Sequence, residues 1–112
     1  MSDCIFCKII NGSIPVEKLY EDENMIVISD LYPQADVHLL MIPKEHYECV
    51  SKMTIQDAQI LGLCIKKFAD FAVESGINDF RLINNCGKSA GQSIFHMHVH
   101  LLAGKGLSEK IV

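Results

Sequence analysis

The sequence has no marked cluster of positive charge, so it lacks the usual footprint of a protein that binds nucleic acid. Its 112 residues include 10 Lys and Arg against 14 Asp and Glu, which gives a net charge of −4. Lys66 and Lys67 form the only adjacent basic pair, and on a helix they would lie on a solvated face. Proteins that bind a duplex usually gather Lys and Arg on one surface. The charge pattern therefore argues against a nucleic-acid partner.

Long apolar runs are also missing. No stretch approaches the roughly 20 residues that a membrane span needs. The first residues, Met1 to Cys4, do not show the basic segment and apolar run of a secretory signal. We therefore expect no membrane association and a cytoplasmic location. The length suits one domain spanning residues 1–112.

The number of cysteines is odd, which does not fit a secreted disulfide framework. Three of the five, Cys49, Cys64 and Cys86, are scattered along the chain. Cys4 and Cys7 form a Cys-x-x-Cys motif, which by itself leaves open a metal-ligand pair and two reduced surface cysteines. A thioredoxin-like role is disfavoured, because that motif normally follows a strand in a βαβ pattern.

The apolar patterns predict an α+β fold. Between residues 54 and 75, apolar side chains recur at three- and four-residue steps and Gly76 follows, which predicts one long helix. A short N-terminal helix is predicted to run to about Ile10, capped by Ser2 or Asp3. Strands are expected at residues 19–20, 25–28, 37–42, 80–83 and 94–102. The fold class is then a sheet of about five antiparallel strands with the long helix packed on one face.

Three histidines alternate with apolar residues near the end of the chain. His96, His98 and His100 would share one face of a strand, because strand side chains alternate between faces. A lone histidine on a strand is usually a half-exposed polar residue, whereas three of the chain's five on one face indicate a site. His96 and His100 would lie roughly 13 Å apart, at about 3.3 Å per residue. Zinc holds each nitrogen at about 2.0–2.1 Å, so the outer pair is not expected to share one ion.

The loop before these histidines suits an anion. Gly87 and Gly91 allow backbone N–H groups to turn toward a ligand, and Asn85, Gln92 and Ser93 add side-chain donors. The glycine spacing is not that of a P-loop. A glycine-rich loop alone is commonly a plain connection. Since this one leads directly into three histidines, we interpret it as a phosphate site.

These segments together resemble the histidine-triad (HIT) family. The run from Gly91 to Leu102 is similar to its signature, His-φ-His-φ-His-φ-φ with an upstream Gly-Gln-Ser. The resemblance extends over nearly the whole chain. Four further segments resemble the Hint branch, the purine nucleotide phosphoramidases: Cys4–Ile10, Ile14–Pro15, Ser29–Ala35 and His38–His46. The resemblance implies the HIT fold and a homodimer whose sheets join edge to edge.

The resemblance also implies catalytic roles. His98 matches the family's nucleophile, which forms a nucleotidyl-imidazole intermediate that water hydrolyses. A neutral imidazole suits this step, because it attacks readily and later leaves. His100 matches a ligand of the α-phosphate, and His38 matches a histidine at the edge of the same site. Ser93 matches a hydroxyl near the leaving group.

Substrate binding is implied at three places. Asp30 matches the carboxylate that binds the ribose hydroxyls. The phosphate loop is matched by Asn85, Gln92 and Ser93. The apolar walls around the base are matched by Phe6, Ile9, Ile14, Ile28 and Leu31.

Zinc is implied by the match to metal-bearing relatives, in which the Cys-x-x-Cys pair is joined by two histidines. The four matching residues here are Cys4, Cys7, His46 and His96. A Cys₂His₂ set forms a closed tetrahedral site, so this Zn²⁺ would brace the fold rather than perform chemistry.

The implied function is hydrolysis of a purine nucleoside 5′-phosphoramidate or a related nucleotide conjugate. Two alternatives stay open. One is hydrolysis of a dinucleoside polyphosphate by the same nucleophile. The other is a zinc-stabilised nucleotide-binding module with little turnover.

Overall fold

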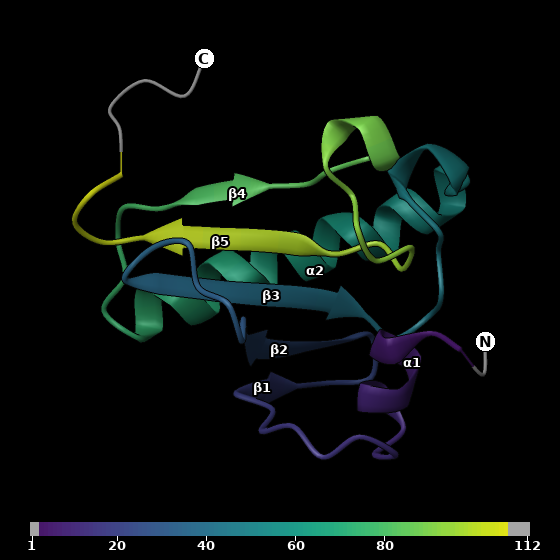
Figure 1. Cartoon of the computed structure of the whole chain (residues 1–112), viewed down its shortest axis with the longest axis horizontal. Helices are drawn as coiled ribbons and strands as arrows, with labels where there is room; N and C mark the ends of the chain where they lie inside the picture. Colours follow the sequence, from purple (N-terminus) through teal and green to yellow (C-terminus); the bar gives the residue numbers. More distant parts are fainter. Residues whose placement is uncertain (1–2, 108–112) are drawn as a thin grey trace.

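Five antiparallel strands form one sheet, with a helix against each of its faces. The computed structural model describes residues 3–107. The strands lie in the order β1-β2-β3-β5-β4 (Figure 1). The elements are α1 (Ile5–Ile10), β1 (Tyr20–Glu21), β2 (Met25–Ser29), β3 (Val37–Pro43), the 3₁₀ turn η1 (Val50–Lys52), α2 (Ile55–Glu74), β4 (Arg81–Ile83), the 3₁₀ turn η2 (Lys88–Ala90) and β5 (Val99–Ala103). The predicted α+β fold, with five antiparallel strands and one long helix, is confirmed.

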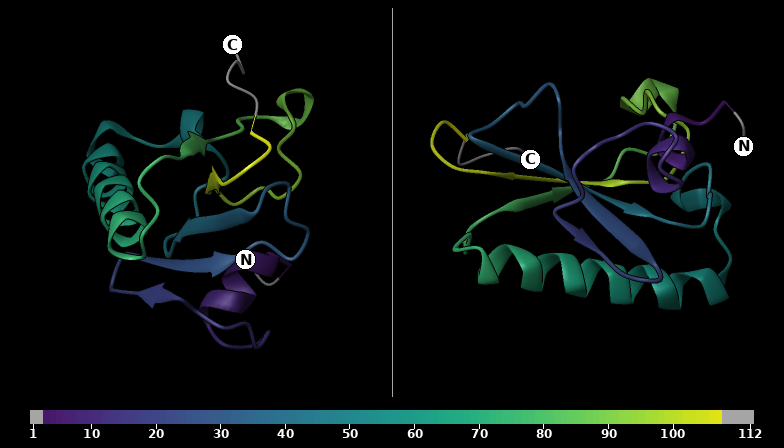
Figure 2. Two further views of the ribbon diagram at one scale, coloured as in Figure 1. Left: turned by 90° about the vertical axis from the view of Figure 1, so that its left-hand side faces the viewer. Right: turned by 90° about the horizontal axis from the view of Figure 1, so that it is seen from below.

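The long helix α2 begins and ends where its sequence signals stand. The Thr54 hydroxyl accepts a hydrogen bond from the Asp57 N–H, and the Asp57 carboxylate accepts one from the Thr54 N–H. Such a cap contributes about 1 kcal/mol. Gly76 follows with a φ of +86°, a conformation that favours glycine. The buried side of α2 packs on one face of the sheet (Figure 2) through Cys64, Phe68 and Ala72.

The opposite face of the sheet is covered at one end by α1 (Figure 2). Phe6 and Ile9 of α1 are buried against Ile26, Ile28, Leu40 and Ile42. The cap of α1 is Cys4 and not Asp3, because the Cys4 sulfur accepts a hydrogen bond from the Cys7 N–H at 3.3 Å. Ser2, the other predicted cap, lies outside the described residues.

The last strand is shorter than predicted, since β5 begins only at Val99. The preceding backbone makes its hydrogen bonds outside the ladder. The Met97 N–H donates to the Tyr47 carbonyl at 2.6 Å, and the Asn84 amide donates to the His98 carbonyl at 2.9 Å. Within β5 the alternation holds, with Val99, Leu101 and Ala103 buried toward α2.

None of the helices within residues 3–107 has the length and apolar character required to cross a membrane.

Candidate active site

His98 is a buried imidazole with one defined tautomer. Its Nδ1 lies 2.7 Å from the carbonyl oxygen of His96, and a carbonyl can only accept a hydrogen bond. Nδ1 therefore carries the proton, and Nε2 keeps a free lone pair. Burial lowers the pKa of His98 below its ordinary value, so the ring is neutral near pH 7. Phe6 packs edge-on against this ring at 5.0 Å between centroids and helps to hold it in place.

A hydrogen bond links His100 to His38, and the Asp30 carboxylate lies beside the same nitrogen of His38. His38 Nε2 lies 2.9 Å from His100 Nδ1 and 3.3 Å from Asp30 Oδ2. The backbone N–H of Gln34 donates to His38 Nδ1 at 3.0 Å, so a neutral His38 carries its proton on Nε2. Although the three groups lie within 4.8 Å of one another, that proton makes Nε2 a donor rather than a metal ligand. The single Nε2 proton thus serves the hydrogen bond to His100, and Asp30 adds an electrostatic contact to the same nitrogen.

The hydrogen bond from His38 determines which nitrogen of His100 carries a proton. Burial and the neighbouring His98 and His38 lower the pKa of His100 to about 4, so this ring is also neutral near pH 7. When its Nδ1 accepts from His38, its own proton lies on Nε2. A neutral His100 can therefore donate a hydrogen bond to an oxygen of a ligand.

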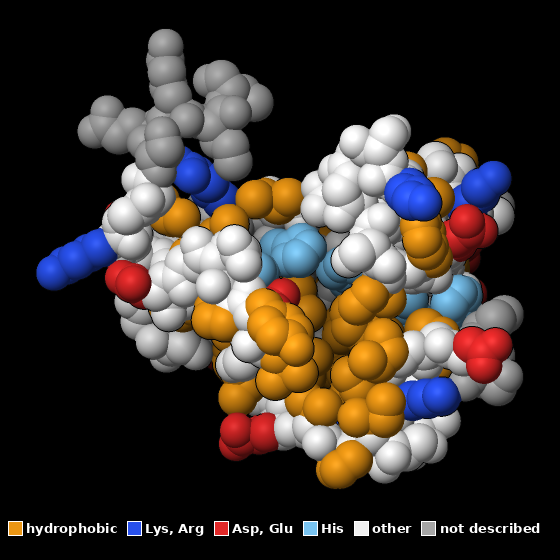
Figure 3. Space-filling model, in the orientation of Figure 1, with side chains coloured by type: hydrophobic (Ala, Val, Ile, Leu, Met, Phe, Trp, Pro, Cys, Tyr) orange, Lys and Arg blue, Asp and Glu red, His pale blue; other side chains and the backbone are white. Residues whose placement is uncertain are grey.

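An apolar pocket lies between α1 and the end of β2. In Figure 3 histidine side chains lie in a hollow bordered by hydrophobic side chains. The pocket has a volume of about 160 Å³ and includes four predicted residues, Phe6, Ile9, Ile28 and Leu31, together with Asp30. Ile14, also predicted as a wall, is half-buried in the core beneath and does not line it. A flat aromatic ligand would find apolar walls here, with a carboxylate at the rim.

The loop predicted to hold phosphate is held in shape by Gln92. The buried Gln92 amide accepts from the Gly87 N–H at 2.8 Å and donates to the carbonyl oxygens of Glu48 and Ile94. Gly87 and Gly91 have φ values of +95° and +100°, which give the loop its turns. Asn85 is half-buried beneath Gly91. The Gln92 side chain is thus used within the protein and supports the loop from inside.

Ser93 lies apart from the histidine chain. It is exposed and lines a shallow pocket with Ile94, Phe95 and the start of α1. Among residues 3–107, its hydroxyl makes no hydrogen bond to a histidine.

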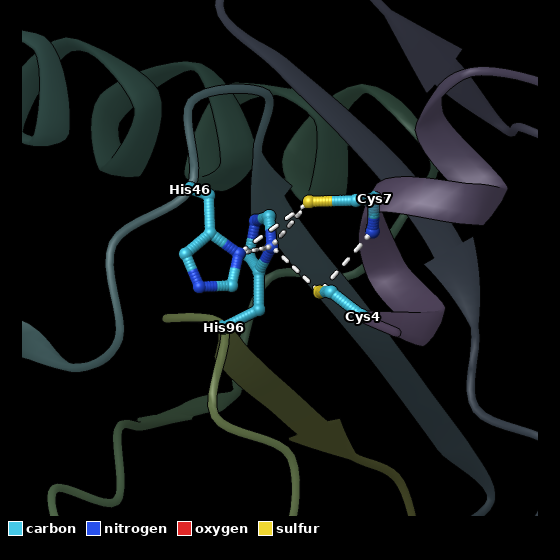
Figure 4. A group of neighbouring side chains, drawn as sticks. All are labelled: Cys4, Cys7, His46 and His96. Atoms are coloured by element: carbon cyan, nitrogen blue, oxygen red, sulfur yellow. Dashed lines mark hydrogen bonds between the residues drawn. The ribbon is translucent and has the colours of Figure 1, made fainter. Parts of the chain in front are cut away.

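A second cluster joins α1 to the segment before β5. Cys4, Cys7, His46 and His96 converge, and their ligand atoms all lie within 4.8 Å of one another (Figure 4). His96 Nδ1 lies 3.3 Å from the Cys4 sulfur, 3.5 Å from the Cys7 sulfur and 3.1 Å from His46 Nδ1. Around one tetrahedral zinc ion such atoms would lie roughly 3.3–3.8 Å apart, given its bond lengths. These four residues can hold a metal ion.

The chemistry of the cluster also fits a metal. His96 Nε2 donates to the Pro43 carbonyl at 2.8 Å, which leaves the Nδ1 lone pair directed at the sulfurs. Burial and the adjacent Cys4 sulfur raise the pKa of the Cys7 thiol, so two thiolates side by side need a cation. Burial lowers the pKa of His96 to about 4, which keeps it neutral as a ligand must be.

Sequence reasoning missed three residues of this region. Tyr32 stands at the rim of the apolar pocket with 79% of its surface exposed. Gln34 sets the tautomer of His38 through its backbone, and Asn84 holds the backbone of His98. The backbone donor of Gln34 leaves no trace in side-chain chemistry, and the side-chain amide of Asn84 meets a backbone carbonyl 14 residues away, so only the aromatic Tyr32 beside Asp30 offered a signal.

Comparison with known proteins gave consistent matches over the whole described chain. The family described as "Scavenger mRNA decapping enzyme C-term binding" matches residues 3–111. An uncharacterized HIT-like protein of Chlamydia muridarum is 47% identical over 104 residues, covering 89% of this chain and 80% of the relative. Protein HitA of Neisseria gonorrhoeae is 39% identical over 103 residues, covering 91% and 96%. A HIT family hydrolase from Clostridium thermocellum has a similar structure, with a TM-score of 0.93, 45% identity and coverage of 100% and 99%.

Proposed function

This chain belongs to the histidine-triad (HIT) family, and we propose that it cleaves the α-phosphate bond of purine nucleoside 5′-phosphoramidates or related nucleotide conjugates. The observation that carries the proposal is the tautomer of His98. A buried, neutral imidazole with its proton tied to the His96 carbonyl presents one lone pair and no competing proton. An imidazole in that state is a nucleophile.

The proposed reaction has two displacements. Nε2 of His98 attacks the α-phosphorus, the P–N bond of the substrate breaks, and the departing nitrogen takes a proton from solvent water to leave as an amine. Water then attacks the same phosphorus, the P–N bond to His98 breaks, and the nucleoside monophosphate is released. The fixed Nδ1–H bond stabilises the cationic ring of the intermediate, because the carbonyl acceptor stays in place.

Three groups are proposed to stabilise and position the phosphate. His100 donates from Nε2 to a nonbridging oxygen, and the hydrogen bond from His38 to its Nδ1 keeps the proton on that donor. Asn85 and backbone N–H groups of the loop that Gln92 braces hold the other oxygens. Ser93, exposed beside Ile94 and apart from the histidines, is proposed to assist the leaving nitrogen. Donors held before the reaction cost little reorganisation, which is the usual source of such catalysis.

Nucleoside recognition is proposed in the apolar pocket. Its walls, including Phe6, Ile9, Ile28 and Leu31, suit a purine base. Asp30, which lines the same pocket, is proposed to accept hydrogen bonds from the ribose hydroxyls. Ile14 supports these walls from the core and does not contact the base.

We assign the Cys4, Cys7, His46 and His96 cluster to a structural Zn²⁺. When bound, this ion supplies a covalent-strength tie between chain segments. All four ligands come from this chain, which leaves no open position for substrate.

Two other functions use the same pocket. With a dinucleoside polyphosphate, the α-phosphate would lie against His98 and the leaving group would be a nucleotide instead of an amine. A binding module would hold nucleotide with little turnover. A free nucleophilic lone pair favours an enzyme, because binding alone has no need for one.

His98→Ala tests the proposal. We expect it to retain binding of adenosine monophosphate and to lose turnover of adenosine 5′-phosphoramidate by several orders of magnitude, as removal of a covalent nucleophile typically does. His98→Asn is the matched control, since its amide can still donate to the His96 carbonyl.

Rapid quench of the wild type with labelled substrate should trap acid-labile label on His98. Near-normal turnover by His98→Ala would refute the mechanism, and binding without any turnover by the wild type would favour the binding module.

A further inference from the structure

Two cysteines that the proposed reaction does not use lie on either side of one hydroxyl. The sulfurs of Cys49 and Cys86 lie 3.2 Å and 3.4 Å from the Ser51 hydroxyl oxygen. Cys49 and Ser51 belong to the turn at η1, whereas Cys86 stands 35 residues further along the chain than Ser51. Cys49 is 7% exposed and Cys86 is half-buried, so a small reagent from solvent meets Cys86 first.

Cys86 is the more reactive of the two by its surroundings. Hydrogen bonds from the Ser51 side chain and backbone, together with the Cys49 thiol, lower the pKa of Cys86 below the ordinary value of a thiol. A lower pKa raises the fraction of thiolate, which is the form that reacts with oxidants. Cys64 differs in both respects, since burial raises its pKa to about 11 and it lies in the core.

The pair is coupled to the loop that is proposed to hold phosphate. Cys86 comes directly before Gly87, whose N–H is fixed by Gln92, and Gln92 in turn donates to the carbonyl of Glu48, next to Cys49. Two residues before Cys86, the Asn84 amide holds the His98 carbonyl. A displacement of Cys86 therefore reaches both the phosphate loop and the backbone of His98.

We propose that Cys49 and Cys86 form an oxidation site for hydroperoxides, in which a disulfide between them shifts the phosphate loop and weakens nucleotide binding. The disulfide step stands on the thiol geometry alone, whereas its effect on binding rests on the proposed function. Both sulfurs already lie beside Ser51, but a disulfide needs them about 2.05 Å apart. Closing that gap must replace the Ser51 hydrogen bonds and draw Cys86 toward the η1 turn.

The chemistry needs one hydrogen peroxide per disulfide. The Cys86 thiolate attacks a peroxide oxygen, an S–O bond forms as the O–O bond breaks, and hydroxide leaves. The sulfur of Cys86 is thereby oxidised by two electrons and the peroxide is reduced. Cys49 then attacks this sulfenic sulfur, an S–S bond forms as the S–O bond breaks, and the oxygen leaves as water with the Cys49 proton. Two thiols and one peroxide give one disulfide and two waters, and a dithiol reductant reverses the change.

Tryptic mapping reads the disulfide independently of activity. Cleavage after Lys and Arg places Cys49 in peptide 45–52, Cys86 in 82–88, Cys64 in 53–66 and the pair Cys4 and Cys7 together in 1–8. After treatment with hydrogen peroxide and alkylation, we expect peptides 45–52 and 82–88 to be linked while 53–66 stays unlinked. Dithiothreitol should release the link. Failure to link these two peptides, or Cys86 oxidised only to sulfinic acid, would overturn the proposal.

Ser51→Ala tests the oxidation of Cys86, and Cys86→Ser tests the effect of that oxidation on nucleotide binding. Ser51→Ala should fold normally and slow the oxidation of Cys86 by about fivefold, the factor lost with one ordinary hydrogen bond. An unchanged oxidation rate would contradict the role of Ser51.

Oxidised wild type should bind adenosine monophosphate about tenfold more weakly than reduced protein, a typical coupling between sites. Cys86→Ser should show no such change with peroxide, and an equal change would overturn the coupling. If reduced wild type binds no nucleotide, the proposed function fails while the mapped disulfide still stands.

Discussion

Single imidazoles are proposed to carry the chemistry of this site, and burial affects their protonation. The pKa of His98 is lowered by removal of the ring from water, so the neutral form persists to lower pH than in a free histidine. Protonation would occupy Nε2 and remove the nucleophile. We therefore expect kcat/KM for adenosine 5′-phosphoramidate to stay level from about pH 8 down to the ordinary histidine pKa of about 6.5 and to fall only below it.

A profile of kcat/KM against pH checks this expectation. The uncatalysed rate is subtracted, and His98→Asn is measured alongside as the background without the imidazole. An acid limb centred at or above the ordinary histidine pKa would show that His98 is not the group that titrates.

Asp30 lies where it supports His38 and where we propose that it binds the ribose, and substitution distinguishes these two roles. Its Oδ1 accepts from the Tyr32 N–H at 2.8 Å, while its Oδ2 lies beside His38. If it also binds the ribose hydroxyls, Asp30→Ala should weaken binding of adenosine monophosphate by about tenfold or more, since hydrogen bonds to a charged group contribute about 1.5–3 kcal/mol. Binding of the 2′-deoxy nucleotide should weaken less. Calorimetric titration of both nucleotides measures the difference, with Asp30→Asn as the control that still can accept from Tyr32. Equal losses for both sugars would leave Asp30 as a support for His38 only.

Among the elements, α1 depends most on its attachments. A helix of 6 residues is not stable by itself, because the cost of starting a helix is spread over too few hydrogen bonds. Phe6 and Ile9 attach α1 to the sheet, and the cysteine–histidine cluster ties its start to the segments around His46 and His96. Since Phe6 also packs on His98, the position of α1 affects the proposed nucleophile.

Removing one metal ligand should therefore affect the whole fold. Protein purified without chelator should hold about one zinc per chain, as a closed four-ligand site does. Cys7→Ala should lose this zinc and lower Tm by about 10 °C or more, because each kcal/mol corresponds to about 4–8 °C in a domain of this size. Elemental analysis and thermal unfolding measure the two effects, and Cys86→Ala is a control that removes a cysteine outside the cluster. Unchanged Tm in the metal-free variant would refute a structural role.

For the whole molecule, the two edges of the sheet differ in a way that bears on assembly. The β1 edge is two residues long, and its Glu21 pairs with Lys44 at 2.8 Å, which blunts an edge against pairing. The β4 edge has no such charge pair among the described residues. Beside it lies an apolar cleft of about 250 Å³, lined by Leu82 and residues of α2 and η1. The β4 side is thus the one suited to the predicted edge-to-edge homodimer.

We expect light scattering after gel filtration to give twice the chain mass of 12.5 kDa. Leu82→Glu should shift the protein toward the monomer, because a charge would then have to be buried at the β4 edge. Leu19→Glu is the matched control, since Leu19 beside β1 has the same 38% exposure as Leu82. A wild type with the mass of one chain would contradict this interface. A Leu82→Glu variant that stays a dimer, like Leu19→Glu, would contradict it too.

The elements could be predicted from the sequence because their signals are local. The spacing of apolar residues identified α2, and Thr54 and Gly76 marked its ends. The alternation in residues 94–102 predicted the last strand, of which the structure keeps Val99–Ala103 as β5, with its apolar side chains directed to α2. The triad and its upstream Gly-Gln-Ser indicated the family from the sequence alone.

The division of labour among the three histidines was decided only by the tertiary structure. His96 turns its Nδ1 to the cysteines because the Pro43 carbonyl accepts from Nε2, and His98 keeps a free Nε2 because of the His96 carbonyl. His100 is tied through His38 to a backbone N–H of Gln34. The meeting of Cys49 with Cys86 is of the same kind. Each of these contacts either joins residues far apart in the chain or uses a backbone group common to all residue types, so no sequence pattern records them.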